Sequence, residues 1–272
     1  MGVEEIFMEQ ADLMRSAANL LEVRKKKIPP QVHEKLTTED ITVRIFKGRS
    51  IRLYADILNF LAGEIQRGDA YSHYFLLPHT RTLLDIFSRF VRLQECDSVK
   101  QALICIGYQL KTCRWEIPLY SNALKLYGPF LSEKGVLFPQ DPALFDERDH
   151  IWKRDLSFGK MKDLLEIQRV KDLSIYTRDV FVGGVVDKMY GPFSEFVHGN
   201  PYQYTGESHN ERFWVAATTI STTAYFIELI DRYTLDWQKP ADARMWLGAA
   251  NKARLKLIDL WRLQIAKRQQ ST

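Results

Sequence analysis

The chain has 272 residues, of which 46% are hydrophobic and 26% charged, a composition typical of a soluble globular protein with a substantial core. Its net charge of +4 permits nucleic acid as a partner without implying it, because dedicated binders concentrate their basic residues far more strongly. The three cysteines, Cys96, Cys105 and Cys113, form no CxxC pair. This argues against a disulfide framework or a structural zinc site and favours buried thiols in a reduced, cytoplasmic setting.

The sequence predicts neither a signal peptide nor a membrane-spanning helix. The first residues are acidic and lack the apolar segment of a signal peptide. The longest uncharged run, residues 213–227, is about five residues short of the roughly 20 that span a bilayer, and it carries several hydroxyl groups. We therefore expect a cytoplasmic protein with no membrane contact, in which this run is a helix buried among other helices.

Helical periodicity dominates the first part of the chain. Residues 4–23 place apolar side chains on one broad face, and a proline pair follows after a basic stretch. The next segment, residues 36–50, alternates instead, with Ile41, Val43 and Ile45 on one side. It fits a lone strand or an extended arm, and because no partner strand lies nearby we interpret it as an arm.

From Ser50, a candidate N-cap, a helix is predicted to continue to Gly68. The next helix, about 70–95, contains Pro78, which must either kink it or mark its true first turn. Asp97 is the predicted cap of the helix that carries the cysteines. The remaining predicted helices cover about 97–113, 117–131, 160–168, 172–190, 208–234 and 240–267.

Residues 132–158 interrupt this pattern with glycines, prolines and dense charge, so we interpret them as an irregular excursion. The whole pattern predicts an all-α fold: one multi-helix bundle over residues 1–272. Within it we expect an N-terminal helix and arm at 1–49, a core at about 50–234 and a C-terminal helix at about 240–267.

One predicted helix carries a polar stripe on an otherwise apolar surface. Arg81, Asp85 and Arg89 follow at intervals of four, and Arg92 comes three residues later. The opposite side is strongly apolar, which places the helix centrally with a single polar face. The stripe is either an exposed ladder of ion pairs or half of a site.

The segment 192–202 supplies the other half of such a site. Because Pro192 starts a fresh turn, Ser194 and His198 share a face, and Glu195 is placed to raise the pKa of His198. Asn200 follows in the turn that ends the segment. The alternative is structural: His198 caps the last carbonyl groups of a helix.

Several familiar chemistries are not supported. Ser194 lacks the GxSxG elbow and the placed acid of a serine hydrolase, so we expect it to orient or to hydrogen-bond. Gly183 and Gly184 lack the spacing of a phosphate-binding loop. The histidines show no metal-binding spacing, so we expect neither a metal nor another cofactor.

Two stretches together resemble the paired signatures of an uncharacterised family of all-helical bacterial proteins: HTRTLLDIF at 79–87 and YGPFSEFVHGNP at 190–201. That family shows an Arg-Thr-Leu-Leu-Asp/Glu helix and a Tyr-x-x-x-Ser-x-x-x-His segment. It is similar to the HEPN superfamily, many members of which are ribonucleases of toxin, antiphage and stress-response systems. The resemblance covers about residues 50–230 and implies an HEPN-like core.

The resemblance implies a metal-independent endoribonuclease that is a toxin or antiphage-defence effector, with RNA as its partner. The 2′-hydroxyl of the RNA attacks its own phosphodiester, so the protein supplies a proton-transfer group and a cation. His198 would be the general acid and base, Arg81 would hold the phosphate and Asp85 would orient it. The pocket would be completed by Tyr190, Ser194, Glu195 and Asn200. The resemblance also implies a homodimer.

The chain departs from the HEPN pattern where catalytic members carry an arginine four to six residues before the histidine. Pro192, Phe193 and Ser194 stand there. The cation would then come from Arg81 or another helix, or the protein is a non-catalytic helical module that binds a regulatory protein or a ligand. A third option is nucleic-acid binding through residues 24–27 and the basic C-terminal helix.

Overall fold

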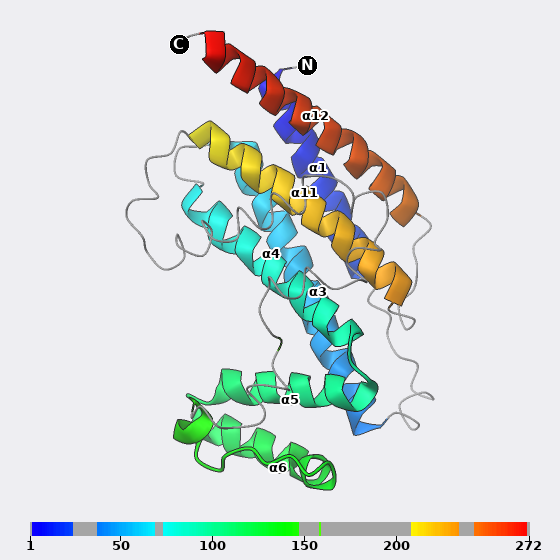
Figure 1. Cartoon of the computed structure of the whole chain (residues 1–272), viewed down its shortest axis with the longest axis vertical. Coiled ribbons are helices and arrows are strands. Elements are labelled where there is room, and N and C mark those ends of the chain that lie inside the picture. Colours follow the sequence, from blue (N-terminus) through cyan, green and yellow to red (C-terminus); the bar gives the residue numbers. More distant parts are fainter. Residues whose placement is uncertain are drawn as a thin grey trace. The chain divides into compact units, whose positions relative to one another are not determined.

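The computed structural model describes residues 2–23, 37–68, 73–146, 158, 208–233 and 242–270. Within these ranges the chain forms seven α-helices, one 3-10 helix and no strand, which confirms the all-α, multi-helix fold (Figure 1). The elements are α1 (Val3–Val23), α3 (Thr38–Arg67), α4 (His73–Gln94), α5 (Ser98–Cys113), α6 (Ile117–Glu133), η1 (Pro142–Asp146), α11 (Ser208–Tyr233) and α12 (Ala243–Gln270). The helices predicted at 160–168 and 172–190 lie outside the described residues.

The chain divides into two compact units. The first comprises Met1–Lys26, Ser50–Ser88 and Leu165–Thr272, and the second comprises Lys27–Arg49 and Arg89–Leu164. Helices α3 and α4 therefore contribute residues to both units. The organisation of the chain as a single domain over 1–272 stays a prediction.

In the first unit, α1, α11 and α12 pack against one another, as Figure 1 shows for the blue, yellow and orange-red helices. Specific bonds support this packing. The indole Nε1 of Trp246 donates to the carbonyl oxygen of Leu13 at 3.0 Å, and the ammonium of Lys256 reaches Glu9 at 2.6 Å. These bonds join α12 to α1 over more than 230 residues of sequence.

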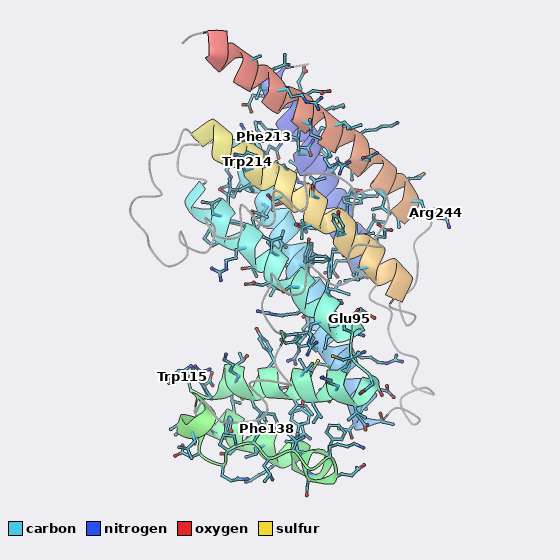
Figure 2. All side chains as sticks on the ribbon, viewed as in Figure 1. Glu95, Trp115, Phe138, Phe213, Trp214 and Arg244 are labelled. Carbon is cyan, nitrogen blue, oxygen red and sulfur yellow. The ribbon has the colours of Figure 1, made fainter. Side chains whose placement is uncertain are left out.

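Helix α11 is the core helix of the first unit. Between Arg212 and Ile230 it is long and apolar enough to cross a membrane, the single such stretch among the described helices, and 94% of that stretch is buried. Figure 2 marks Phe213 and Trp214 near its first turns. Burial among other helices, the interpretation favoured for residues 213–227, is confirmed.

The segment predicted as an extended arm is instead the first part of α3, so that prediction is wrong. Thr37 caps the helix, because its Oγ1 accepts a hydrogen bond from the amide of Asp40 at 3.2 Å. Backbone and Thr37 hydrogen bonds lower the pKa of Glu39 in the same turn. Ser50 is therefore an interior residue of α3 rather than an N-cap.

The predicted end of this helix at Gly68 is confirmed, with a φ of 64° that favours glycine.

The second unit is built around the pair α5 and α6. Asp97 caps α5 as predicted, since its carboxylate accepts from the amide of Lys100 at 2.8 Å. The two helices enclose an apolar core, to which α3 contributes Val43. The loop after α6 contributes Phe138, which is marked in Figure 2. Of the predicted excursion, 132–158, the structure describes 132–146 and 158: Ser132 and Glu133 are instead the last residues of α6, and 134–146 are irregular apart from η1. Phe158 stacks on Phe46 with ring centroids 5.4 Å apart.

Candidate functional site

Helix α4 carries the polar stripe on one side and a fully packed apolar surface on the other. The apolar side chains are at most 2% exposed, as the sequence pattern predicts: Leu83, Leu84, Phe87, Phe90 and Val91. Pro78 lies inside the helix, five residues after its start at His73, so the alternative of a first-turn proline is wrong. The helix is thus held on its apolar side, and its stripe residues are fixed in position by that packing.

Arg81 and Asp85 form an ion pair one turn apart on α4. The guanidinium Nε lies 3.9 Å from Oδ2 of Asp85, and the two side chains are only 19% and 32% exposed. A half-buried pair is screened less by water than an exposed one. The pair is therefore partly rather than fully exposed, and whether it is a structural ion pair or half of a site stays open.

The ladder of ion pairs predicted for the stripe does not extend to Arg89. Arg89 belongs to the second unit, where its guanidinium carbon lies 4.6 Å from the ring centroid of Tyr108 and 5.9 Å from that of Phe158. Such cation–π contacts account for the position of Arg89. Within the stripe, Arg81 and Asp85 form the ion pair that is a candidate for phosphate binding.

Hydroxyl groups surround the Arg81–Asp85 turn and bind its backbone. Thr80 donates to the carbonyl of Leu76 at 2.8 Å, and Ser88 donates to the carbonyl of Asp85 at 2.8 Å. These bonds saturate carbonyl groups of α4 locally. The ring of His79 lies tilted against the ring of Phe60 of α3, with ring centroids 4.4 Å apart, within the first unit.

The remaining predicted site residues lie outside the described residues: His198, Tyr190, Ser194, Glu195 and Asn200. Of the seven, the structure places Arg81 and Asp85, and it brings those two together. The roles given to the other five stay predictions.

The described residues contain no group of three or more His, Cys, Asp or Glu side chains that could hold a metal ion. An open groove of about 620 Å³ runs along α1 and is acidic. Its lining comes from α1 alone: Glu4, Glu5, Met8, Glu9, Asp12 and Leu13. None of these is a predicted site residue.

Arg212, on α11, is a buried cation that the sequence analysis did not identify. It is 5% exposed, its Nε donates to the carbonyl of Ile65 at 2.7 Å, and its guanidinium carbon lies 4.1 Å from the ring centroid of Phe7. A Cβ added to Gly68 would lie 2.8 Å from its Nη1. No local motif marks Arg212, because its main partner is 147 residues away.

A half-buried guanidinium held by a neighbouring carboxylate is suited to binding an oxyanion, because the planar fork of arginine matches two phosphate oxygens. This is the chemistry that the Arg81–Asp85 pair can offer. Comparison of the chain with protein-family models, with curated proteins and with solved structures finds no match in any of the three.

Proposed function

We propose that the chain is an HEPN-like, metal-independent endoribonuclease of the cytoplasm, acting as a toxin or antiphage-defence effector. The observation that supports this proposal is the half-buried Arg81–Asp85 pair, at the place where the resembling family carries its Arg-Thr-Leu-Leu-Asp/Glu motif. A cation partly withdrawn from water interacts more strongly with a phosphate than an exposed one does.

The reaction needs no protein nucleophile. His198, as the general base, would take the proton of the 2′-hydroxyl, whose oxygen then attacks the adjacent phosphorus. The bond from phosphorus to the 5′-oxygen breaks, and the protonated His198, as the general acid, would return its proton to that oxygen as it leaves. The products are a 2′,3′-cyclic phosphate and a 5′-hydroxyl, and neither oxidant nor metal is consumed.

Arg81 would stabilise the negative charge that develops on the phosphorane, and Asp85 would hold the guanidinium in position. Tyr190, Ser194, Glu195 and Asn200 would shape the pocket. The RNA backbone is chemically the same in every sequence. These groups would therefore account for cleavage, while other surfaces would determine which RNA is bound. The resemblance further implies that the active form is a homodimer.

Incubation of the purified chain with tRNA and with total RNA, with and without EDTA, tests the proposal. We expect cleavage that EDTA does not suppress and that His198→Ala abolishes. Absence of cleavage by the wild-type chain, or equal cleavage by His198→Ala, would overturn it. Detection of a cyclic phosphate end distinguishes this mechanism from hydrolysis by an activated water.

A second candidate is a non-catalytic helical module that binds a regulatory protein or a small ligand. The observation that favours it is the Pro192-Phe193-Ser194 stretch, which replaces the arginine of catalytic HEPN domains. This candidate predicts that a nucleotide or a protein partner raises the melting temperature of the chain without any turnover. RNA cleavage that depends on His198 would exclude it.

A further inference from the structure

Three aromatic rings of the second unit lie close to the guanidinium of Arg89. The ring of Phe46, on α3, stands edge-on to the ring of Tyr108, on α5, with centroids 5.8 Å apart and 85° between the planes. Phe158 stacks on Phe46 and stands at 76° to Tyr108, with centroids 5.4 Å apart in both pairs. We call these four residues the Arg89 ring cluster. All of them belong to the second unit.

The Arg89 ring cluster lies at the edge of the core of the second unit and is not enclosed by it. Phe46 and Phe158 pack against that core, yet all four side chains of the cluster are half-buried. The core ring of Tyr120, by contrast, is 0% exposed. The cluster therefore keeps aromatic and guanidinium surface accessible to a ligand.

The helix segments that carry the cluster are basic. They are residues 41–49 of α3, 89–94 of α4 and 98–113 of α5, and none of them contains Asp or Glu. Together they contain seven basic residues: Arg44, Lys47, Arg49, Arg89, Arg92, Lys100 and Lys111. The ammonium of Lys47 donates to Gln101 at 3.3 Å, and Gln101 lies about two turns before Tyr108 on the same face of α5. Positive charge is thus placed beside the rings.

Aromatic rings combined with basic side chains are the means by which proteins bind single-stranded nucleic acid. A base stacks through its π face on a ring or on a guanidinium, while basic side chains bind the phosphates on either side of it. A free organic cation fits less well, because the guanidinium carbon of Arg89 already lies 4.6 Å from the ring centroid of Tyr108. An unpaired base, in contrast, uses both the rings and the cations.

We propose that the Arg89 ring cluster is a stacking site for an unpaired base of single-stranded RNA, whose neighbouring phosphates bind the basic residues of α3, α4 and α5. The choice of RNA over DNA rests on the proposed function, whereas the stacking rests on the cluster. A base inside a duplex has its faces covered by its neighbours, so the site selects unpaired segments. It supplies a selectivity that phosphate binding by Arg81 lacks, since phosphate contacts carry no sequence information.

Fluorescence anisotropy of a labelled 2′-O-methyl RNA of about 12 nucleotides, within the usual range of site sizes, measures this binding. Such a strand has no 2′-hydroxyl to attack its phosphodiester. Binding is therefore measured whether or not the chain cleaves RNA, and failure of this inference is distinguishable from failure of the proposed ribonuclease.

We expect Tyr108→Leu to weaken the binding at least about tenfold, because the ring that stacks is lost while an apolar side chain is kept. Trp115→Leu is the matched control and should keep the wild-type affinity. The guanidinium carbon of Arg114 also lies 4.6 Å from the ring centroid of Trp115, but that ring belongs to no cluster and Glu116 follows it. Thermal unfolding checks that both variants are folded.

A second pair of variants separates stacking from charge. Arg89→Lys keeps the charge and removes the planar guanidinium, so it should weaken binding about tenfold and leave the dependence on salt unchanged. Arg49→Gln should instead lower the slope of log affinity against log salt concentration by about 0.7, the value of one phosphate contact in a single strand. A cluster that only packs against the core would leave Arg89→Lys with the wild-type affinity.

Four results would overturn the inference. They are no binding of the strand by the wild-type chain, wild-type affinity in Tyr108→Leu, equal affinity for a duplex of the same sequence, and tighter binding of the corresponding DNA strand. Competition by inorganic polyphosphate that equals competition by RNA would likewise contradict it, because a surface that binds phosphate alone requires no base.

Discussion

Arg212 hydrogen-bonds to the carbonyl oxygen of Ile65, 147 residues earlier in the chain, and so satisfies a carbonyl in the last turn of α3. The same guanidinium lies on the ring of Phe7 and pairs with Glu4 at 2.9 Å, which joins α1, α3 and α11 at one point. All of these residues belong to the first unit. This unit also contains Arg81 and Asp85.

We expect Arg212→Ala to lower the free energy of unfolding by about 3 kcal/mol, because it leaves a buried carbonyl without its charged donor. Glu4→Gln should cost no more than about 1 kcal/mol, since the Glu4 side chain is 67% exposed and its ion pair is screened. Urea unfolding followed by far-UV circular dichroism measures both. Equal costs for the two substitutions would contradict the view that the bond to Ile65 dominates.

Tyr54 and Thr223 share a hydrogen bond of 3.1 Å between two side chains that are fully buried. Burial raises the pKa of the Tyr54 phenol, which keeps the proton of this bond in place. We expect Tyr54→Phe to cost about 1 to 3 kcal/mol, because the Thr223 hydroxyl is left unpaired.

The double variant Tyr54→Phe/Thr223→Val provides the control. It should be more stable than Tyr54→Phe alone, since removal of both partners leaves no unsatisfied polar group. Thermal unfolding of the four members of this cycle measures the coupling. Strictly additive costs would show that the hydrogen bond contributes nothing.

Burial also raises the pKa of the Cys105 thiol, to about 12. An unfolded cysteine ionises near pH 8.5, at about its ordinary pKa. Because the folded-state pKa is the higher one, the contribution of Cys105 to stability is complete below about pH 8.5 and is lost as the pH rises toward 12. The free energy of unfolding should fall across this range by up to about 1.4 kcal/mol per pH unit from this group.

Cys105→Ala should show a shallower fall, and comparison of the two pH profiles isolates the thiol from the other groups that titrate there. Cys113→Ala is the matched control, because that thiol is only half-buried. Identical slopes in the wild-type chain and in Cys105→Ala would contradict the burial of this thiol.

The sequence predicted the helices with the clearest apolar periodicity. The prediction was wrong for residues 36–50, where a strand-like alternation competes with the signals of a helix start. Ile41, Val43 and Ile45 alternate like a strand, yet Val43 is buried while Ile41 and Ile45 are 37% and 49% exposed in a helix. A signal was present: Thr37 and Asp40 form a capping motif at the start of α3. Alternation over so few residues is weaker evidence than a cap followed by acidic residues.

Of the candidate site, the sequence predicted the Arg81–Asp85 pairing, because residues four apart on a helix are neighbours. It did not predict that Arg89 would contact Tyr108, nor that Arg212 would contact Ile65. Those contacts join segments far apart in the chain, and no local spacing encodes them.

The rate of RNA cleavage by Arg81→Ala, relative to the wild-type chain and to Arg262→Ala, tests the central claim most directly. Arg262 is the matched control, because it pairs with Asp259 on α12 at 3.7 Å but is 73% exposed. We expect Arg81→Ala to lose about 100-fold or more of the rate, as does the removal of one preorganised group that stabilises transition-state charge, while Arg262→Ala keeps wild-type activity. Equal rates for Arg81→Ala and the wild-type chain would contradict the assignment of the site to α4.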